Sequence, residues 1–283
     1  MNNDQFQRTR MLIGDDAMQR LQTAKVAVFG VGGVGGHAVE VIARSGIGAI
    51  DLFDADDVSL TNLNRQIIAL HSTIGRPKVD VAKERIADIN PMCKVTANKM
   101  FYLPENADGV DLSQYDYVVD CVDTMSAKIE LITRCKALNV PIISSMGAAN
   151  KFDPTAFRVC DIFKTQGDPL AKVIRKKMRQ LGIRHLKVVC SEELPQKPNL
   201  TDTTDAPQTD VQPTMSNGEN LKDCINECNE NLSSNCQEHQ NLKLKPSSSP
   251  VPASNAFVPA AAGIIIGGEV IKDIAFNKLK DKS

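Results

Sequence analysis

Apolar and polar positions follow two different periods along the first half of the chain. Short apolar runs have the length and composition expected of buried strands, and they cover residues 26–29, 49–53, 94–99, 117–121 and 141–145. Between them, apolar residues recur every three or four positions, which predicts helices at residues 37–44, 78–89 and 127–138. Strands that alternate with helices favour an α/β fold with a Rossmann-like, doubly wound, mostly parallel sheet.

The pattern changes beyond residue 195. Residues 196–254 are rich in Asn, Thr, Ser, Pro and acidic side chains and have almost no periodic apolar positions, so we predict a disordered polar insertion there. Apolar helical spacing returns at residues 257–276. We therefore expect a main domain at residues 1–195, followed by the insertion. A C-terminal apolar helix within residues 255–283 would pack on the main domain or in a dimer interface.

The distribution of charge adds a second contrast between these parts. The chain has 33 Lys and Arg and 34 Asp and Glu, so its net charge of −1 predicts neither nucleic-acid nor membrane binding. Residues 196–250 alone carry −4, which leaves +3 for the remainder. Residues 172–187 hold seven basic side chains and no acid. Such a segment is suited to bind phosphates, although a solvated helix face is the alternative interpretation.

Terminal and cysteine patterns suggest the compartment. The first residues lack the apolar segment of a secretory signal, and no uninterrupted apolar run reaches the length of a membrane span. We expect a cytoplasmic protein and leave peripheral membrane association open. Reduced thiols are then the default for the eight cysteines. Within the insertion, a metal site or incidental side chains are the two interpretations of Cys224, Cys228, Cys236 and His239.

A glycine-rich segment, GVGGVG, follows the first predicted strand at residues 30–35. Gly30 permits a tight turn, Gly32 lets the backbone approach a phosphate chain, and Gly35 allows close helix packing. Asp54 ends the next strand, where an acid can bind ribose hydroxyls. This pattern indicates a nucleotide site, with a purely structural turn as the alternative, and it does not distinguish NAD from ATP.

The residues after Asp54 favour ATP. They form three polar segments, DADDVSLTNLNRQ at 54–66, GRPK at 75–78 and DCVDT at 120–124. An enzyme that splits ATP needs cations on the phosphates and a carboxylate for magnesium, and Arg65, Lys78 and Asp123 can supply these. Taken singly, Lys78 could be a surface lysine and Asp123 a helix cap.

Together these segments resemble the ThiF/MoeB/HesA family, the adenylyltransferases related to ubiquitin-activating enzymes. The resemblance implies that residues 1–195 form an ATP-binding adenylyltransferase domain. It also implies a homodimer in which Arg8, with Arg10 as second choice, reaches the partner's ATP. Phosphate neutralisation is implied for Lys78, and a role linked to magnesium (Mg²⁺) for Asp123. The remaining implied nucleotide contacts are Gly30, Gly32, Gly33, Gly35, Asp54, Asn62, Arg65 and Gln66.

Within the family, the chain is most similar to the bacterial tRNA threonylcarbamoyladenosine dehydratases, the YgdL/TcdA group. The motifs are LNRQIIALH, INPMCKV, the segment at 144–183 and FVPAAAGIIIGGEVIKDI near the end. The resemblance implies a tRNA modification enzyme that uses ATP to activate the carboxylate of threonylcarbamoyladenosine and cyclises it with loss of water. It also leaves a sulfur-relay protein partner open. The tRNA contacts expected from the basic segment are Lys172, Arg175, Lys176, Lys177 and Arg179.

Other functions remain in competition at this point. The chain could activate the C-terminus of a small ubiquitin-like carrier protein, as MoeB and ThiF do, but it lacks the C-x-x-C pairs with which those enzymes usually hold zinc. It could also be a nucleotide sensor without turnover, which the set of Arg65, Lys78 and Asp123 argues against. A NAD-dependent dehydrogenase is the last alternative.

Overall fold

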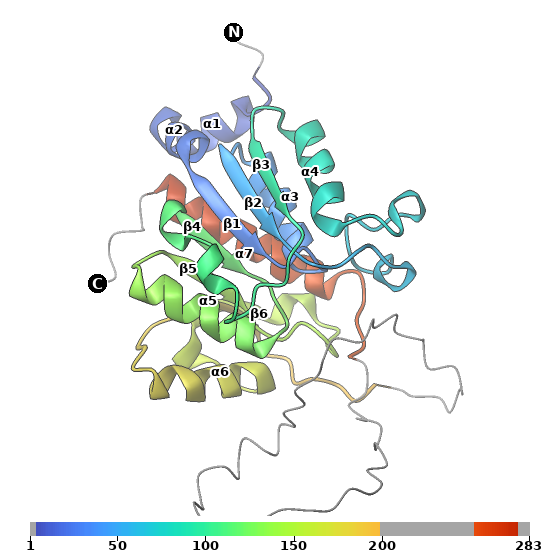
Figure 1. Ribbon diagram of the computed structural model, residues 1–283, viewed down its shortest axis with the longest axis vertical. Coiled ribbons are helices and arrows are strands. Elements are labelled where there is room, and N and C mark those ends of the chain that lie inside the picture. The colour runs from blue at the N-terminus through green and yellow to red at the C-terminus, as the bar shows by residue number, and fades with distance from the viewer. Residues whose placement is uncertain (1–3, 199–251, 277–283) are drawn as a thin grey trace, which may run out of the picture. The chain divides into compact units, whose positions relative to one another are not determined.

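A seven-stranded sheet forms the centre of the fold (Figure 1). The computed structural model describes residues 4–198 and 252–276, and the statements below concern these residues. The strand order is β3-β2-β1-β4-β5-β7-β6, with β6 antiparallel to β7 and the other neighbours parallel. The strands are β1 (Lys25–Phe29), β2 (Ala49–Phe53), β3 (Lys94–Asn98), β4 (Tyr117–Asp120), β5 (Ile142–Ser145), β6 (Phe157–Asp161) and β7 (Lys187–Ser191).

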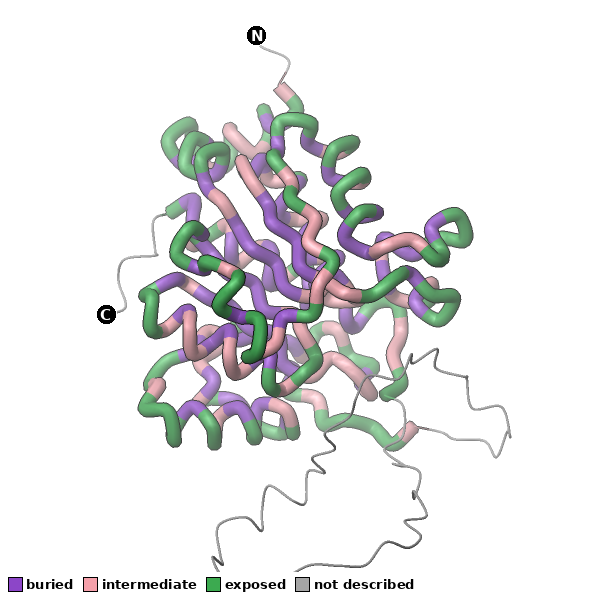
Figure 2. The backbone as a smooth tube through the Cα atoms, viewed as in Figure 1, coloured by how far each residue is buried: buried purple, intermediate pink, exposed green. Residues whose placement is uncertain are grey.

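The central strands are apolar on both faces because helices cover both sides of the sheet. Val26 and Val28 of β1 face one hydrophobic core, whereas Ala27 and Phe29 face the other, as the two-residue period of a strand requires. Figure 2 shows the resulting continuous buried band through the central strands. The doubly wound, mostly parallel α/β fold predicted from the sequence is confirmed.

Helices divide between the two faces. The described helices are α1 (Gln7–Ile13), α2 (Asp15–Thr23), α3 (Gly35–Arg44), α4 (Lys78–Ile89), α5 (Met125–Ala137), α6 (Pro169–Gln180) and α7 (Val258–Ala275). Buried side chains of α3, α4 and α7 belong to one core, and those of α5 and α6 to the other. Helices on both faces of a mostly parallel sheet are what defines a doubly wound fold.

Helix α7 packs closely on α3 although most of the chain separates them in sequence. A β-carbon added at Gly263 would lie 2.2 Å from the carbonyl oxygen of Val34, and one at Gly267 would lie 2.9 Å from that of Ala38. The two helix backbones can approach this closely only because glycine has no side chain. Pro259, in the first turn of α7, thereby reaches the edge of the sheet where the glycine-rich loop lies.

The predicted elements agree with the structure to within two residues at most boundaries, but α1, α2, β6, α6 and β7 are not among the predicted ranges. Strand β6 has mainly exposed or half-buried residues and lies at the edge of the sheet, so its apolar signal is weak. Helix α6 overlaps the first part of the basic segment. The predicted insertion at 196–254 and its cysteines fall almost entirely outside the described residues, so those expectations stay predictions. Among the described helices none is both long and apolar enough to cross a membrane.

Candidate active site

The glycine-rich loop joins β1 to α3 through contacts that only glycine permits. Gly30 has a φ of +87°, and a β-carbon there would lie 2.6 Å from the carbonyl oxygen of Cys121. At Gly35 a β-carbon would lie 1.8 Å from the carbonyl oxygen of Gly30. The loop therefore folds back on itself beside the end of β4. Helix α3 begins here, and the unpaired amides of a helix N-terminus favour bound phosphate.

A cavity of about 390 Å³ opens beside this loop, at the carboxyl edge of the sheet. The edge is well defined because Phe29, the last residue of β1, lies in register with Phe53 of β2 and Asp120 of β4. Open parallel sheets bind ligands at this edge. Nine of the predicted site residues line the cavity: Gly30, Gly32, Gly33, Asp54, Asn62, Arg65, Gln66, Lys78 and Asp123.

Asp54 holds the glycine loop to the end of β2. Its Oδ2 accepts a hydrogen bond from the backbone N–H of Val31 at 2.7 Å, and its Oδ1 accepts one from that of Asp56 at 2.9 Å. Burial raises the pKa of Asp54, while the nearby Lys78 ammonium and these two hydrogen bonds oppose the rise. A carboxylate fixed in this way faces the cavity from the position where an acid can bind ribose hydroxyls.

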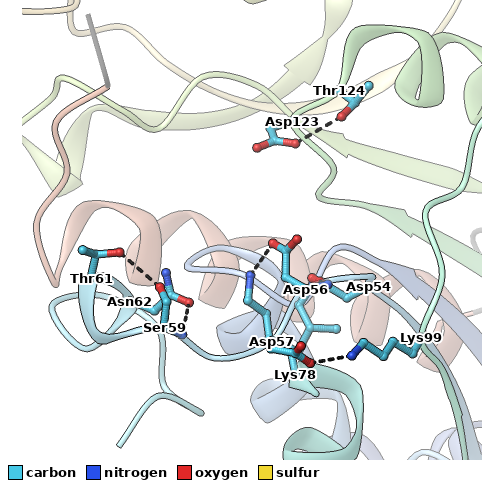
Figure 3. A network of polar contacts seen from close by, with 11 residues as sticks. Asp54, Asp56, Asp57, Ser59, Thr61, Asn62, Lys78, Lys99, Asp123 and Thr124 are labelled. Atoms are coloured by element: carbon cyan, nitrogen blue, oxygen red, sulfur yellow. Dashed lines mark hydrogen bonds and ion pairs between the residues drawn. The ribbon is translucent and has the colours of Figure 1, made fainter. Parts of the chain in front are cut away.

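Lys78 and Asp123 lie on opposite sides of the opening (Figure 3). The Lys78 side chain is only 6% exposed, and its Nζ donates to Oδ2 of Asp56 at 2.7 Å. Asp56 itself is 55% exposed. Asp123 is exposed and accepts a long hydrogen bond of 3.4 Å from the hydroxyl of Thr124. The cavity thus has a cation on one wall and a solvated carboxylate on the other, as the phosphates of ATP and a magnesium ion require.

The segment between β2 and α4 supplies the third wall. The guanidinium of Arg65 donates to the carbonyl oxygen of Thr61 at 2.9 Å, and Oδ1 of Asn62 accepts from the backbone N–H of Ser59 at 3.1 Å. The buried Oε1 of Gln66 has no hydrogen-bond partner among the described residues. Because Gln66 lines the cavity, this oxygen is available to accept a hydrogen bond from a bound ligand.

Some predicted residues lie away from the cavity. Gly35 packs against Gly30 within the glycine-rich loop and does not line the cavity. Arg8 is exposed on α1, beside Phe6, whose ring lies against Gly46 near the amino end of β2. The second choice, Arg10, already pairs with Asp4 and Asp15 at 2.9 Å. Neither arginine lines the cavity of its own chain.

The basic side chains of residues 172–187 differ in their exposure and in their partners. On α6, Lys172, Lys176 and Lys177 are exposed, whereas Arg175 is half-buried and donates to the carbonyl oxygen of Thr165 at 2.6 Å. Arg179 is also exposed, with its guanidinium over the ring of Phe163. Beyond α6, Lys187 belongs to β7 and pairs with Glu269 and Asp273 of α7. Four of the five predicted tRNA contacts are therefore exposed on α6, and Arg175 is half-buried.

Several cavity residues were missed by sequence reasoning. Phe29 and Phe53 stack with their centroids 4.3 Å apart, and Tyr102 meets Phe29 edge to face. The aromatic residues that follow the third strand were the one available signal for this apolar end of the cavity. The remaining additions come from loops and from α7, and they include Met100, Phe101, Ala148, Ala149, Pro252, Ser254 and Pro259.

The model of the ThiF family matches residues 6–275, which include the glycine loop, every lining residue of the cavity and α7. The chain belongs to the ThiF family. This ThiF-family chain is 44% identical to the tRNA threonylcarbamoyladenosine dehydratase of Bacillus subtilis, over 98% of the chain and 99% of that relative. The resemblance to this family inferred from the sequence motifs is confirmed.

Solved structures of Escherichia coli tRNA N6-threonylcarbamoyladenosine dehydratase, TcdA, are similar to the ThiF-family chain along nearly its whole length. The complex with AMP has a TM-score of 0.75 and 30% identity. The complex with ATP has a TM-score of 0.74 and 29% identity. Each comparison covers 98% of the chain and 96% of the solved one. These relatives therefore bind an adenine nucleotide on the same fold.

The residues of this ThiF-family cavity fit a nucleotide with its magnesium. The nucleotide could be bound by three features: the closely packed glycines, the N-terminus of α3 and the unpaired oxygen of Gln66. No cluster of three or more His, Cys, Asp or Glu in the described part of the chain could hold a metal ion by itself. A single carboxylate, Asp123, would be enough to hold magnesium beside a bound nucleotide, because this ion usually takes only one or two carboxylates from the protein.

Proposed function

We propose that the chain is an ATP-dependent tRNA threonylcarbamoyladenosine dehydratase. The proposal rests mainly on the length of the match to the Bacillus subtilis relative. It covers 98% of this chain and so extends beyond the residues that bind ATP. A second support is the cavity, which combines a glycine loop, a buried lysine and an exposed carboxylate. The substrates are then ATP and a tRNA that carries threonylcarbamoyladenosine.

The chemistry proceeds in two steps. In the first, an oxygen of the threonyl carboxylate forms a bond to the α-phosphorus of ATP, and the bond to pyrophosphate breaks. In the second, the carbamoyl group of the same nucleoside attacks the activated carbonyl carbon, AMP leaves, and the carbamoyl group gives up a proton. The nucleoside has then lost one water. Adenylation is needed because a carboxylate oxygen is a poor leaving group.

The residues of the chain bind and orient these groups. Lys78 and Arg65 neutralise phosphate charge as it develops, and Asp54 holds the ribose. Magnesium, when bound at Asp123, would supply further positive charge at the phosphates. Gln66 and Asn62 complete the nucleotide contacts.

The described cysteines favour direct cyclisation over sulfur or thioester chemistry. Cys121 lines the cavity, but burial, together with the neighbouring charge of Asp120, raises the pKa of its thiol to about 12. Burial also raises the pKa of Cys135 and of Cys190 to about 12. Thiols rather than thiolates are present at neutral pH, and the thiol is the unreactive form. Cyclisation needs no enzyme nucleophile, whereas passing sulfur to a relay partner does.

We also propose that two copies of the chain form a homodimer in which Arg8 of one copy contacts ATP bound by the other. Arg8 lies too near the amino edge to line its own cavity, so a second copy is the available source of the contact. The tRNA would bind through the exposed lysines of α6, Lys172, Lys176 and Lys177.

Mass spectrometry of tRNA nucleosides tests the function. Purified protein is incubated with ATP, magnesium and tRNA that carries threonylcarbamoyladenosine. We expect a product about 18 mass units lighter, only when ATP is present, with AMP and pyrophosphate formed in equal amounts. Unchanged tRNA together with ATP cleavage that requires a carrier protein ending in Gly-Gly would replace the dehydratase by the carrier-activating alternative.

A further inference from the structure

The loop that follows β5, residues 147–151, joins distant parts of the fold. Ala148 and Ala149 line the nucleotide cavity. Asn150, with a φ of +59°, donates from its backbone to the carbonyl oxygen of Ala253 at 2.8 Å and accepts from the backbone of Gln196 at 2.7 Å. The loop is therefore held by chain segments from both sides of residues 199–251. Its last residue turns away from the cavity and connects the loop to α6.

That last residue, Lys151, forms a completely buried ion pair. Its Nζ lies 3.0 Å from Oδ2 of Asp168 and donates to the carbonyl oxygen of Gly147 at 2.6 Å. The side chains of Lys151 and Asp168 are 0% and 1% exposed. Removing two charges from water is costly, and apolar residues often replace such a pair without loss of stability. The pair is therefore better explained by the geometry that it imposes than by a contribution to folding.

Asp168 fixes the start of α6 at the same time. Its Oδ1 accepts a hydrogen bond from the backbone N–H of Ala171 at 2.8 Å, so it is the N-cap of the helix. A β-carbon at Gly147 would lie 2.8 Å from Oδ2 of Asp168. The carboxylate reaches the loop only because residue 147 has no side chain. One aspartate thus joins the first turn of α6 to the wall of the cavity.

Packing along the rest of α6 also prevents the helix from shifting. Ile174 and Met178 are completely buried against the second core, whereas Lys172, Lys176 and Lys177 project from the exposed face. Because the helix is fixed at its first turn and along its inner face, the lysines stand at a set position relative to Ala148 and Ala149.

We propose that the Lys151–Asp168 pair positions the RNA substrate relative to the nucleotide. The pair holds α6 in register with the cavity wall, so that phosphates bound by the α6 lysines place the substrate carboxylate opposite the α-phosphate of ATP. The proposal rests on the function proposed above. Both residues act through α6 and the loop, and neither touches a substrate.

Three variants test this assignment: Lys151→Met, Asp168→Ser and the double variant. Serine keeps an N-cap for α6 and removes the charge. The number of sites that bind ATP counts the folded enzyme, and kcat and KM for tRNA are measured per such site. We expect each single variant to keep its ATP affinity and its KM for tRNA while kcat falls by about 10- to 100-fold, since small misplacements are costly.

The double variant separates positioning from folding. It has no unpaired buried charge, so we expect its thermal stability to recover relative to the single variants while kcat stays low. Recovery of kcat to the wild-type value per ATP-binding site would overturn the proposal, as would a wild-type kcat in the single variants.

Lys25→Met is a control for the removal of a less buried ion pair at the opposite edge of the sheet. Lys25 pairs with Asp51 at 2.9 Å near the amino end of β1, far from the loop, with 30% and 8% of the side chains exposed. We expect its kcat per ATP-binding site to match the wild type. If the wild type binds ATP but leaves the modified nucleoside unchanged, the proposed function fails and this inference fails with it. If the wild type and all the variants are fully active, the inference is refuted while the proposed function stands.

Discussion

At the scale of residues, Lys78 is a buried cation whose partner is solvated. Asp56 is more than half exposed, so its carboxylate can turn into water at little cost when a phosphate replaces it. The ammonium has no such freedom because only 6% of its side chain is exposed. The protein therefore keeps a positive charge in place at the cavity before the nucleotide arrives.

Lys78→Met should weaken ATP binding by about 10- to 100-fold, the value of one charge-assisted hydrogen bond. Isothermal titration calorimetry measures this change. Lys99→Met is the control, since Lys99 makes a similar ion pair with Asp57 nearby but does not line the cavity (Figure 3). Equal ATP affinities for the two variants would remove Lys78 from the phosphate site.

Asp123→Asn should change the response to magnesium. An amide is a weaker ligand than a carboxylate, so the magnesium concentration for half-maximal turnover should rise by about tenfold. Titration of magnesium at saturating ATP measures this value. A curve identical to that of the wild type would show that Asp123 does not serve the ion.

The site residues that could be predicted are those in contiguous motifs with a chemical reason, such as Gly30, Asp54 and Lys78. Ala149 and Pro259 have no chemistry of their own and reach the cavity only through tertiary packing. Lys187 shows the same limit, since the sequence shows only that it belongs to a basic segment. Its true partners lie more than eighty positions away on α7, beyond the reach of any local pattern.

At the scale of elements, an ion-pair cluster fastens α7 to β7. Nζ of Lys187 lies 2.6 Å from Oε2 of Glu269 and 2.8 Å from Oδ2 of Asp273. Burial alone would lower the pKa of Lys187, but its hydrogen bonds to the two acids raise it overall. Burial alone would raise the pKa of Glu269, but its hydrogen bonds with Lys187 and Lys272 lower it overall. The cluster is therefore stabilising while both groups are charged.

Lys187→Met should lower the Tm by about 5 °C near neutral pH. The lowered pKa of Glu269 means that its contribution is present above its ordinary value of 4.5 and is lost as the pH falls through the folded value. The contribution of Lys187 is present below 10.5 and is lost at higher pH. Thermal melts of both proteins should therefore differ near neutral pH and converge in acid; a constant difference would contradict this account.

Most strands and helices with strong apolar periods could be predicted, whereas the edge strand β6 could not. β1 and β2 are buried on both faces, so their sequences have little choice of residue type. β6 borders the sheet with exposed Arg158 and Val159, and its direction depends on β7 rather than on its own residues. The direction of such a strand is a tertiary property, which periodicity does not encode.

At the scale of the whole molecule, the dimer proposal predicts complementation between two inactive variants. In a mixed dimer of Arg8→Ala and Lys78→Met, one of the two sites would have both an intact lysine and the partner's arginine. Random pairing should then restore about a quarter of the wild-type activity. Co-expression with two affinity tags provides the mixed dimers. If Arg8 served its own chain, neither site of a mixed dimer would work.

Replacement of the three exposed α6 lysines, Lys172, Lys176 and Lys177, by Glu should weaken tRNA binding. The slope of log affinity against log salt should become shallower by about one unit for each phosphate that the variant no longer binds. Lys83→Glu on the exposed side of α4 is the control for added negative charge. An unchanged salt slope in the triple variant would place the RNA on another surface.

Because α7 packs on α3, the nucleotide cavity can be completed only late in the synthesis of the chain. The glycine loop, β1 and α3 leave the ribosome early, but the wall at Pro259 and the close-packing Gly263 emerge only after residues 199–251 have been made. Until then α3 exposes the groove that α7 will fill, and the nucleotide cavity lacks one side. Nascent chains are therefore expected to bind ATP only after α7 has been translated, and a chaperone that shields the α3 groove would favour correct folding.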